Sequence, residues 1–175
     1  MKLIEMRKNS FVRFGCEPMG SFAAEKVLTE TIVARDEHAA DRYFVEISLP
    51  MHVSSYALAG YVFEPADCDA LKIEVSVKED RQVFQDSLGW QKELIYAGLN
   101  EEYAEIVLEA VKKYFLGRIA PKGKLRICMG AYSSVSSGRL IFGIAVNILL
   151  DIFMERKLDE EKIRNIVQQR MEQRF

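Results

Sequence analysis

The chain has 175 residues, which suits one compact domain or at most two small ones. Hydrophobic residues make up 49% and charged residues 29%, so disordered, collagen-like and disulfide-rich scaffolds are excluded. The net charge of −2 provides no overall positive field that would make nucleic acid the default partner.

The N-terminal third carries patterns typical of strands. Residues 25–33 are rich in β-branched side chains, and residues 43–49 alternate between two faces. A polar turn at residues 36–41 separates them, so the sequence predicts a β-hairpin. Residues 56–63 form a further candidate strand, in which Gly60 would permit a bulge.

The middle of the chain begins with the clearest strand pattern. Residues 71–77 carry apolar side chains at every odd position and mostly polar ones between them. Residues 81–95 show no clear periodicity, and we expect Trp90 to anchor them to a core. Asn100 then predicts a helix start, because its side chain can accept a free backbone N–H of the first turn. Gly117 is the expected stop of this helix.

The last third continues with a strand and two helices. The strand covers residues 125–129, an apolar helix covers residues 139–156, and an amphipathic helix begins near Leu158. The order of strands, helix, strand, helix and helix predicts an α+β fold, a two-layer sandwich of one sheet and helices. We expect residues 1–175 to form a single compact domain.

Cysteine usage and hydropathy indicate a compartment. Cys16, Cys68 and Cys128 are isolated and odd in number, which favours free thiols in a reducing, cytoplasmic setting. The N-terminus is charged and lacks the apolar run of a signal peptide. The most apolar stretch, residues 140–153, is shorter than the ~20 residues that cross a bilayer, so we expect no membrane insertion.

No motif for catalysis, a metal or a cofactor is found. His38 and His52 belong to no metal-ligand pattern, and the sequence has no phosphate-binding loop of the nucleotide-hydrolase or dinucleotide type. We therefore expect no catalytic residue, no metal site and no cofactor.

A serine-rich loop before the apolar helix is the one segment with chemical potential. Its hydroxyls and free N–H groups converge on a helix N-terminus, an arrangement that can hold an anion. In the alternative interpretation Ser136 or Ser137 simply caps the helix. The candidate anion- or RNA-binding residues here are Tyr132, Ser133, Ser134, Ser136 and Ser137.

This loop also carries a family resemblance. The segment resembles the strand, loop and helix of the fourth domain of translation elongation factor G, which reads G-x-Y-H-D-V-D-S-S before an apolar helix. The matching places hold Gly130, Tyr132, Val135, Ser136, Ser137, Phe142 and Ala145. Upstream, the strand at residues 71–77 and the helix opened by Glu102-Tyr103 resemble the family's preceding elements. The resemblance covers about residues 70–153.

The resemblance implies a left-handed β-α-β unit, a fold shared with a ribosomal-protein domain and with GHMP kinases. The core would be residues 66–156, flanked by a β-rich region at 1–65 and a C-terminal helix at 157–175. Ser133, Ser134 and Ser136 stand where the family's loop has a histidine and aspartates. The chain has no GTPase motif and is too short for a complete kinase.

The function that the resemblance implies is a non-enzymatic binding module that contacts RNA or the ribosome. Residues 121–175 carry a net charge of +4 and residues 66–120 a net charge of −4. Phosphate contacts could therefore come from the basic side chains of the last third, namely Lys122, Lys124, Arg126 and Arg139.

Two alternatives stay open. The first is a structural protein that forms homo-oligomers through the apolar stripe of the C-terminal helix, Ile163, Ile166, Val167 and Met171. The second is a small anion- or nucleotide-binding enzyme that uses the serine loop at residues 133–138.

Overall fold

The computed structural model describes residues 1–6, 10–36, 41–49, 55–89, 93–155 and 157–172. Its strands are β1 (Lys2–Met6), β2 (Ser10–Gly15), β3 (Lys26–Asp36), β4 (Arg42–Ser48), β5 (Tyr56–Pro65), β6 (Ala70–Val77), β7 (Gln82–Val83), β8 (Ile95–Ala97), β9 (Ala120–Pro121) and β10 (Gly123–Ser133). Its helices are α1 (Glu101–Phe115), α2 (Arg139–Met154) and α3 (Glu160–Glu172).

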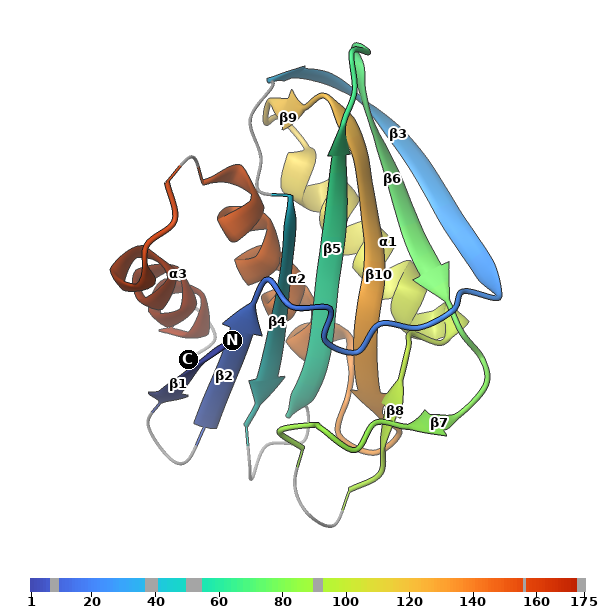
Figure 1. Ribbon diagram of the computed structural model, residues 1–175, viewed down its shortest axis with the longest axis vertical. Helices are drawn as coiled ribbons and strands as arrows, with labels where there is room; N and C mark the ends of the chain where they lie inside the picture. The colour runs from blue at the N-terminus through green and yellow to red at the C-terminus, as the bar shows by residue number, and fades with distance from the viewer. Residues whose placement is uncertain (7–9, 37–40, 50–54, 90–92, 156, 173–175) are drawn as a thin grey trace.

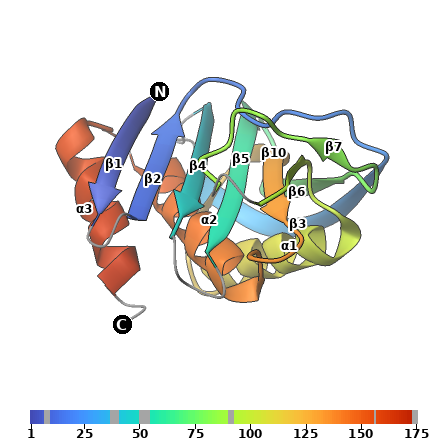
Figure 2. The same ribbon diagram turned by 90° about the horizontal axis from the view of Figure 1, so that it is seen from below.

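The strands form one mixed sheet that the three helices cover on one face (Figures 1 and 2). The strand order is β1-β2-β4-β5-β10-β6-β3-β9, and β8 pairs with the end of β10. Leu71, Ile73 and Val75 of β6 are fully buried in the core between sheet and helices. The alternation predicted at residues 71–77 and the α+β class are therefore confirmed.

The connection from β6 to β10 has an unusual hand. The two strands are parallel neighbours, and both run down the page in Figure 1. The helix α1 lies behind the sheet, and β10 lies to the left of β6. A path down β6, up through α1 behind the sheet and down β10 on the left is a left-handed crossover. Such connections are rare, since about 98% of parallel crossovers are right-handed.

The hairpin predicted from residues 25–33 and 43–49 is wrong. Both segments are strands, but β3 pairs with β6 and β9, whereas β4 pairs with β2 and β5. Three strands separate them in the sheet. Neighbours in sequence are not always neighbours in a sheet, and here each strand matches a more distant partner along most of its length.

The region at residues 1–65 is an integral part of the sheet. Its strand β5 lies beside β10 with β4 next along the sheet, and its strand β3 lies on the other side of β6. Gly60 of β5 allows this close packing, because an added Cβ there would lie 2.8 Å from Phe44 Cβ and 2.9 Å from the Tyr43 carbonyl. The register shift expected at Gly60 lies instead in the opposite strand, between Ile127 and Met129.

A buried ionic network holds a loop across the outer face of the sheet. Glu46 is fully buried, and its Oε2 accepts a hydrogen bond from Arg13 Nε at 2.6 Å. Its Oε1 accepts from Tyr56 Oη at 2.7 Å and from the backbone N–H of Leu88 at 2.8 Å. Arg13 also donates to the carbonyl of Asp86. The loop after β7 is thereby fastened to β2, β4 and β5.

The helix termini agree partly with the sequence signals. Asn100 caps α1 as predicted, and its Oδ1 accepts the N–H of Tyr103 at 3.0 Å. In α3, Ile163, Val167 and Met171 are buried in the protein's own core. The apolar stripe of α3 is therefore already covered within the protein. Self-association stays a prediction, but an uncovered stripe no longer supports it.

Two further expectations concern individual residues and membrane insertion. His38, His52 and Trp90 lie outside the described residues. Within the described segments no helix is both long and apolar enough to span a membrane.

Candidate anion-binding surface

The serine loop is a turn whose hydroxyl groups mostly bond within the protein. Ser133 is fully buried, and its Oγ accepts the N–H groups of Val135 and Ser136, each at 3.1 Å. Ser137 Oγ donates to the carbonyl of Tyr56 at 2.6 Å and accepts the N–H of Ser133 at 2.8 Å. These bonds build a rigid connection between β10 and α2.

The other residues of this loop divide between inside and outside. Ser136 is buried, and its hydroxyl donates to Glu93, whereas Ser134 is exposed. The ring of Tyr132 is buried against Tyr103, with centroids 5.0 Å apart. Of the five predicted loop residues, only Ser134 is exposed to a large ligand.

The predicted cap by Ser136 or Ser137 is wrong. Gly138 is the N-cap of α2, and no side chain accepts a hydrogen bond there. Both serine hydroxyls are already used within the turn or by Glu93. The first turn of α2 also has no acidic residue, so its positive dipole end is not neutralised from within the helix.

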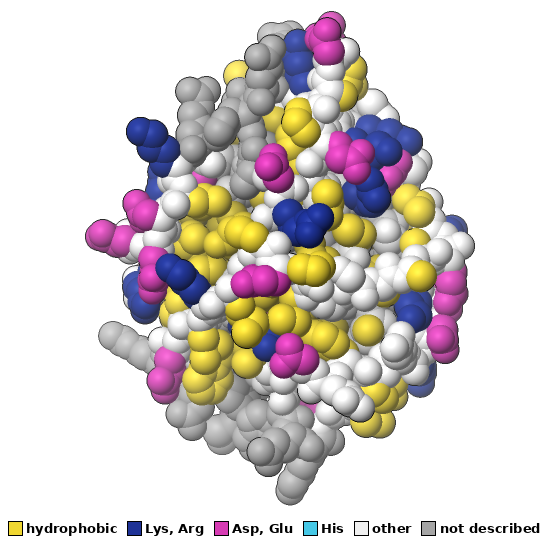
Figure 3. Space-filling view, in the orientation of Figure 1, with side chains coloured by type: hydrophobic (Ala, Val, Ile, Leu, Met, Phe, Trp, Pro, Cys, Tyr) yellow, Lys and Arg dark blue, Asp and Glu magenta, His cyan; other side chains and the backbone are white. Residues whose placement is uncertain are grey.

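The basic residues predicted on β10 lie far from the loop and are paired with acids. Lys124 and Arg126 lie in the first half of β10, and the serine turn follows its last residue. Arg126 contacts Glu64, and Glu74 lies 3.8 Å from Lys124 and 3.9 Å from Arg126. Figure 3, which looks onto this face, shows Lys, Arg, Asp and Glu side chains interleaved there.

Two further contacts complete this paired surface. Lys122 Nζ lies 3.1 Å from Asp69 Oδ1, and Lys72 Nζ lies 2.8 Å from Glu74 Oε1. The pairing with Lys72 lowers the pKa of the Glu74 carboxyl, so Glu74 is ionised and compensates its basic neighbours. Little positive potential remains on this face for a phosphate.

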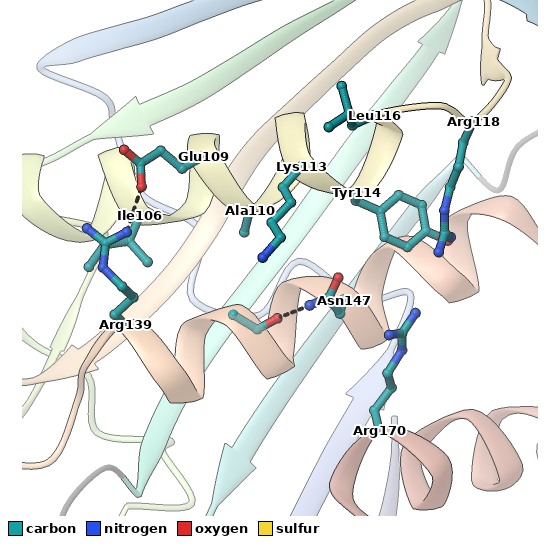
Figure 4. Close-up of a pocket in the computed structure, with 11 residues that line it drawn as sticks. Ile106, Glu109, Ala110, Lys113, Tyr114, Leu116, Arg118, Arg139, Asn147 and Arg170 are labelled. Atoms are coloured by element: carbon teal, nitrogen blue, oxygen red, sulfur yellow. Dashed lines mark hydrogen bonds and ion pairs between the residues drawn. The ribbon is translucent and has the colours of Figure 1, made fainter. Parts of the chain in front are cut away.

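A groove on the opposite, helical face gathers cations that are less compensated (Figure 4). It has a volume of about 500 Å³ and lies between α1 and α2, with α3 at one end. Small residues, Ala110 on α1 and Gly143 on α2, also line it. The cations that line it are Lys113, Arg118, Arg139 and Arg170.

These four cations differ in how firmly they are held. Arg170 donates two hydrogen bonds to Asp151, at 2.5 and 2.8 Å, and this contact raises its pKa. Arg118 lies over the ring of Tyr114 at 4.1 Å from the centroid. Lys113 forms no ion pair with any described residue, and its side chain extends from α1 into the groove.

Arg139 connects the groove with the serine turn. It is the first residue of α2 and donates to Glu109 of α1 at 2.6 Å. Both side chains are largely exposed, 72% for Arg139 and 64% for Glu109, so water screens this pair. Exposed pairs of this kind contribute ~0–1 kcal/mol, so a competing anion can replace the carboxylate.

Arg139 is thus the one basic residue predicted for binding that lies in the groove. The other three, Lys113, Arg118 and Arg170, come from α1, the following turn and α3, and none of them was predicted from the sequence. A signal existed, because Ile106, Ala110 and Lys113 recur at the spacing of one helix face. The sequence does not indicate that this face of α1 lies against α2 and lines a groove with it.

The described residues contain no cluster of His, Cys, Asp and Glu that could hold a metal ion. Comparison with known proteins found no matching family model, no matching curated protein and no matching solved structure. The resemblance to elongation factor G therefore stays a prediction.

Proposed function

We propose that this protein is a non-enzymatic module that contacts RNA or the ribosome, built on a fold like that of elongation factor G domain IV. The observation that carries the proposal is the set of four cations around the groove between α1 and α2, two of which, Lys113 and Arg118, have no ion-pair partner among the described residues.

The fold supports the likeness that the sequence suggested. A left-handed crossover joins β6 to β10, as the resemblance implies, and such crossovers are rare. The strand, serine turn and apolar helix that carry the motif are consecutive as β10, residues 134–138 and α2.

The electrostatics support an anionic partner on the helical side. Among the described residues, two of the four groove cations pair with a carboxylate, Arg139 with Glu109 and Arg170 with Asp151. Lys and Arg contacts to phosphate supply most of the sequence-independent affinity for nucleic acid. The paired surface of β10 has no comparable excess of positive charge.

The thiols support a reducing compartment such as the cytoplasm. Cys16 and Cys68 are exposed and free, and Cys128 is half-buried and free. Burial raises the pKa of the Cys128 thiol, which makes it a poor nucleophile.

A filter-binding and sedimentation experiment tests the proposal. Purified protein is mixed with ribosomal RNA and with ribosomes at low salt, where electrostatic binding is strongest. We expect association with wild-type protein and a loss of about tenfold or more in affinity for the double variant Lys113→Ala/Arg139→Ala. The matched control Lys112→Ala/Arg164→Ala removes the same charge outside the groove and should bind like wild type.

The proposal fails if wild-type protein associates with neither RNA nor ribosomes at low salt. It also loses its structural basis if the control variant weakens binding as much as the groove variant, because net charge alone would then explain the effect.

A further inference from the structure

We propose that the groove between α1 and α2 binds a single nucleic-acid strand along its phosphodiester backbone, with Glu109 as a built-in competitor. This inference rests on the proposed function and specifies the ligand of the same site.

The cations form a row that runs along the groove. In Figure 4 Arg139 lies at one end, Lys113 in the middle, and Arg118 with Arg170 at the other end. From Arg139 to Asp151, the partner of Arg170, α2 advances ~18 Å at 1.5 Å per residue. A strand advances ~3.4 Å per phosphate in duplex geometry, and more when extended. The row therefore matches a few successive phosphates.

The size of the groove favours one strand over a duplex. Lys113 extends from α1 and Arg139 from α2, so a strand that lies along the groove can contact both. The groove has a volume of about 500 Å³, which one backbone of a few phosphates can occupy. A duplex, whose two strands are separated by a major groove ~12 Å wide, can present only one of its strands to the row.

The groove offers no stacking surface for bases. Its aromatic residue, Tyr114, is 6% exposed and lies beneath Arg118. Binding should therefore depend on the backbone, tolerate any sequence and respond strongly to salt.

Glu109 occupies the position of a ligand anion at one end of the row. Its Oε2 lies 2.6 Å from Arg139 Nη1. A phosphate that binds Arg139 must displace this carboxylate and then lies close to it. Removing the charge in Glu109→Gln should tighten binding several-fold, because the repulsion disappears while the side-chain volume is kept.

Fluorescence anisotropy at low salt tests the inference directly. The probes are oligouridine of about 12 nucleotides, a mixed-sequence duplex of equal length, and polyglutamate of equal charge. We expect the single strand to bind about tenfold more tightly than either of the others. For about three phosphates, log K should fall with log salt at a slope of about −2, and Lys113→Ala should reduce it by about 0.7. Lys112→Ala should leave the slope unchanged.

Four results would overturn the inference. Equal or tighter binding of the duplex with retained RNA association rejects the single-strand groove but leaves the proposed function standing. Tighter binding of polyglutamate assigns the groove to acidic protein segments. Unchanged or weaker binding by Glu109→Gln rejects its role as a competitor. Absence of binding by every nucleic acid at low salt rejects the inference and the proposed function together.

Discussion

Lys112 and Lys113 are consecutive residues of α1, yet their ammonium groups serve different surfaces. Lys112 Nζ lies 2.7 Å from Glu30 Oε2 on β3, so it ties the helix to the sheet. Lys113 lines the groove to α2 (Figure 4). A turn of about 100° per residue is enough to separate a stabilising lysine from a lysine available to a ligand.

The buried pair of Arg13 and Glu46 should be important for stability. Glu46→Ala leaves the guanidinium of Arg13, which is 8% exposed, without its carboxylate. Breaking a buried ion pair from one side costs ~3–5 kcal/mol. We expect a loss of this size in the free energy of unfolding, measured by urea titration.

The double variant Arg13→Met/Glu46→Met serves as the control. It removes both charges and retains apolar volume, so its loss should be smaller than the sum of the losses in the single variants Arg13→Met and Glu46→Met. Additive losses would contradict the account of a coupled pair.

The carboxyl of Glu74 should make stability depend on acid pH. Its pKa in the folded protein is lowered from the usual value of 4.5, chiefly by a hydrogen bond from Lys72. The stabilisation is therefore complete above the unfolded pKa and is lost as the pH falls through the lower, folded pKa. Urea titrations of wild type and Glu74→Gln should differ at neutral pH and converge below pH 4.5. A difference between wild type and Glu74→Gln that stays constant with pH would contradict the assignment.

Two glycines should respond in opposite directions to alanine. In Gly60→Ala the new Cβ would lie 2.8 Å from Phe44 Cβ, and such overpacking costs ~1–3 kcal/mol. In Gly143→Ala the Cβ meets nothing within 4 Å, and helix propensity should add ~0.5–1 kcal/mol of stability. Thermal unfolding of both variants checks the signs. Stabilisation of Gly60→Ala would show that the sheet packs less closely there.

Asp151 should anchor α3, whereas Glu109 should not affect stability. Asp151 accepts two hydrogen bonds from Arg170 and one from Tyr114 Oη at 2.9 Å. Burial, with Asp151 adding to it, raises the pKa of the Tyr114 hydroxyl, so Tyr114 stays a donor. Asp151→Ala should lose ~1.5–3 kcal/mol and increase amide hydrogen exchange in α3. Glu109→Ala should stay within ~1 kcal/mol of wild type. Equal losses would contradict this distinction.

The local features of the fold could be predicted from the sequence. The alternation at residues 71–77 and the cap at Asn100 depend on neighbouring residues alone, and both are confirmed. The predicted hairpin failed because β3 pairs with β6, a strand about 40 residues away, and nothing local encodes that choice.

The candidate site was harder to predict for the same reason. From the sequence alone, Lys124 and Arg126 are plausible phosphate ligands. In the fold, β5 and β6 place Glu64 and Glu74 beside them. Lys113 lines a groove only because α1 packs against α2. Charge compensation across elements decides which cations are available, and this follows from topology.

Lysine acetylation footprinting of the wild-type protein tests the central claim most directly. Low-salt samples with and without single-stranded RNA are treated briefly with an acetylating reagent, and each lysine is quantified by mass spectrometry. The groove account predicts that RNA protects Lys113, while Lys112 and Lys124 react equally in both samples. Protection of Lys124 with no change at Lys113 would contradict it and return the binding surface to β10.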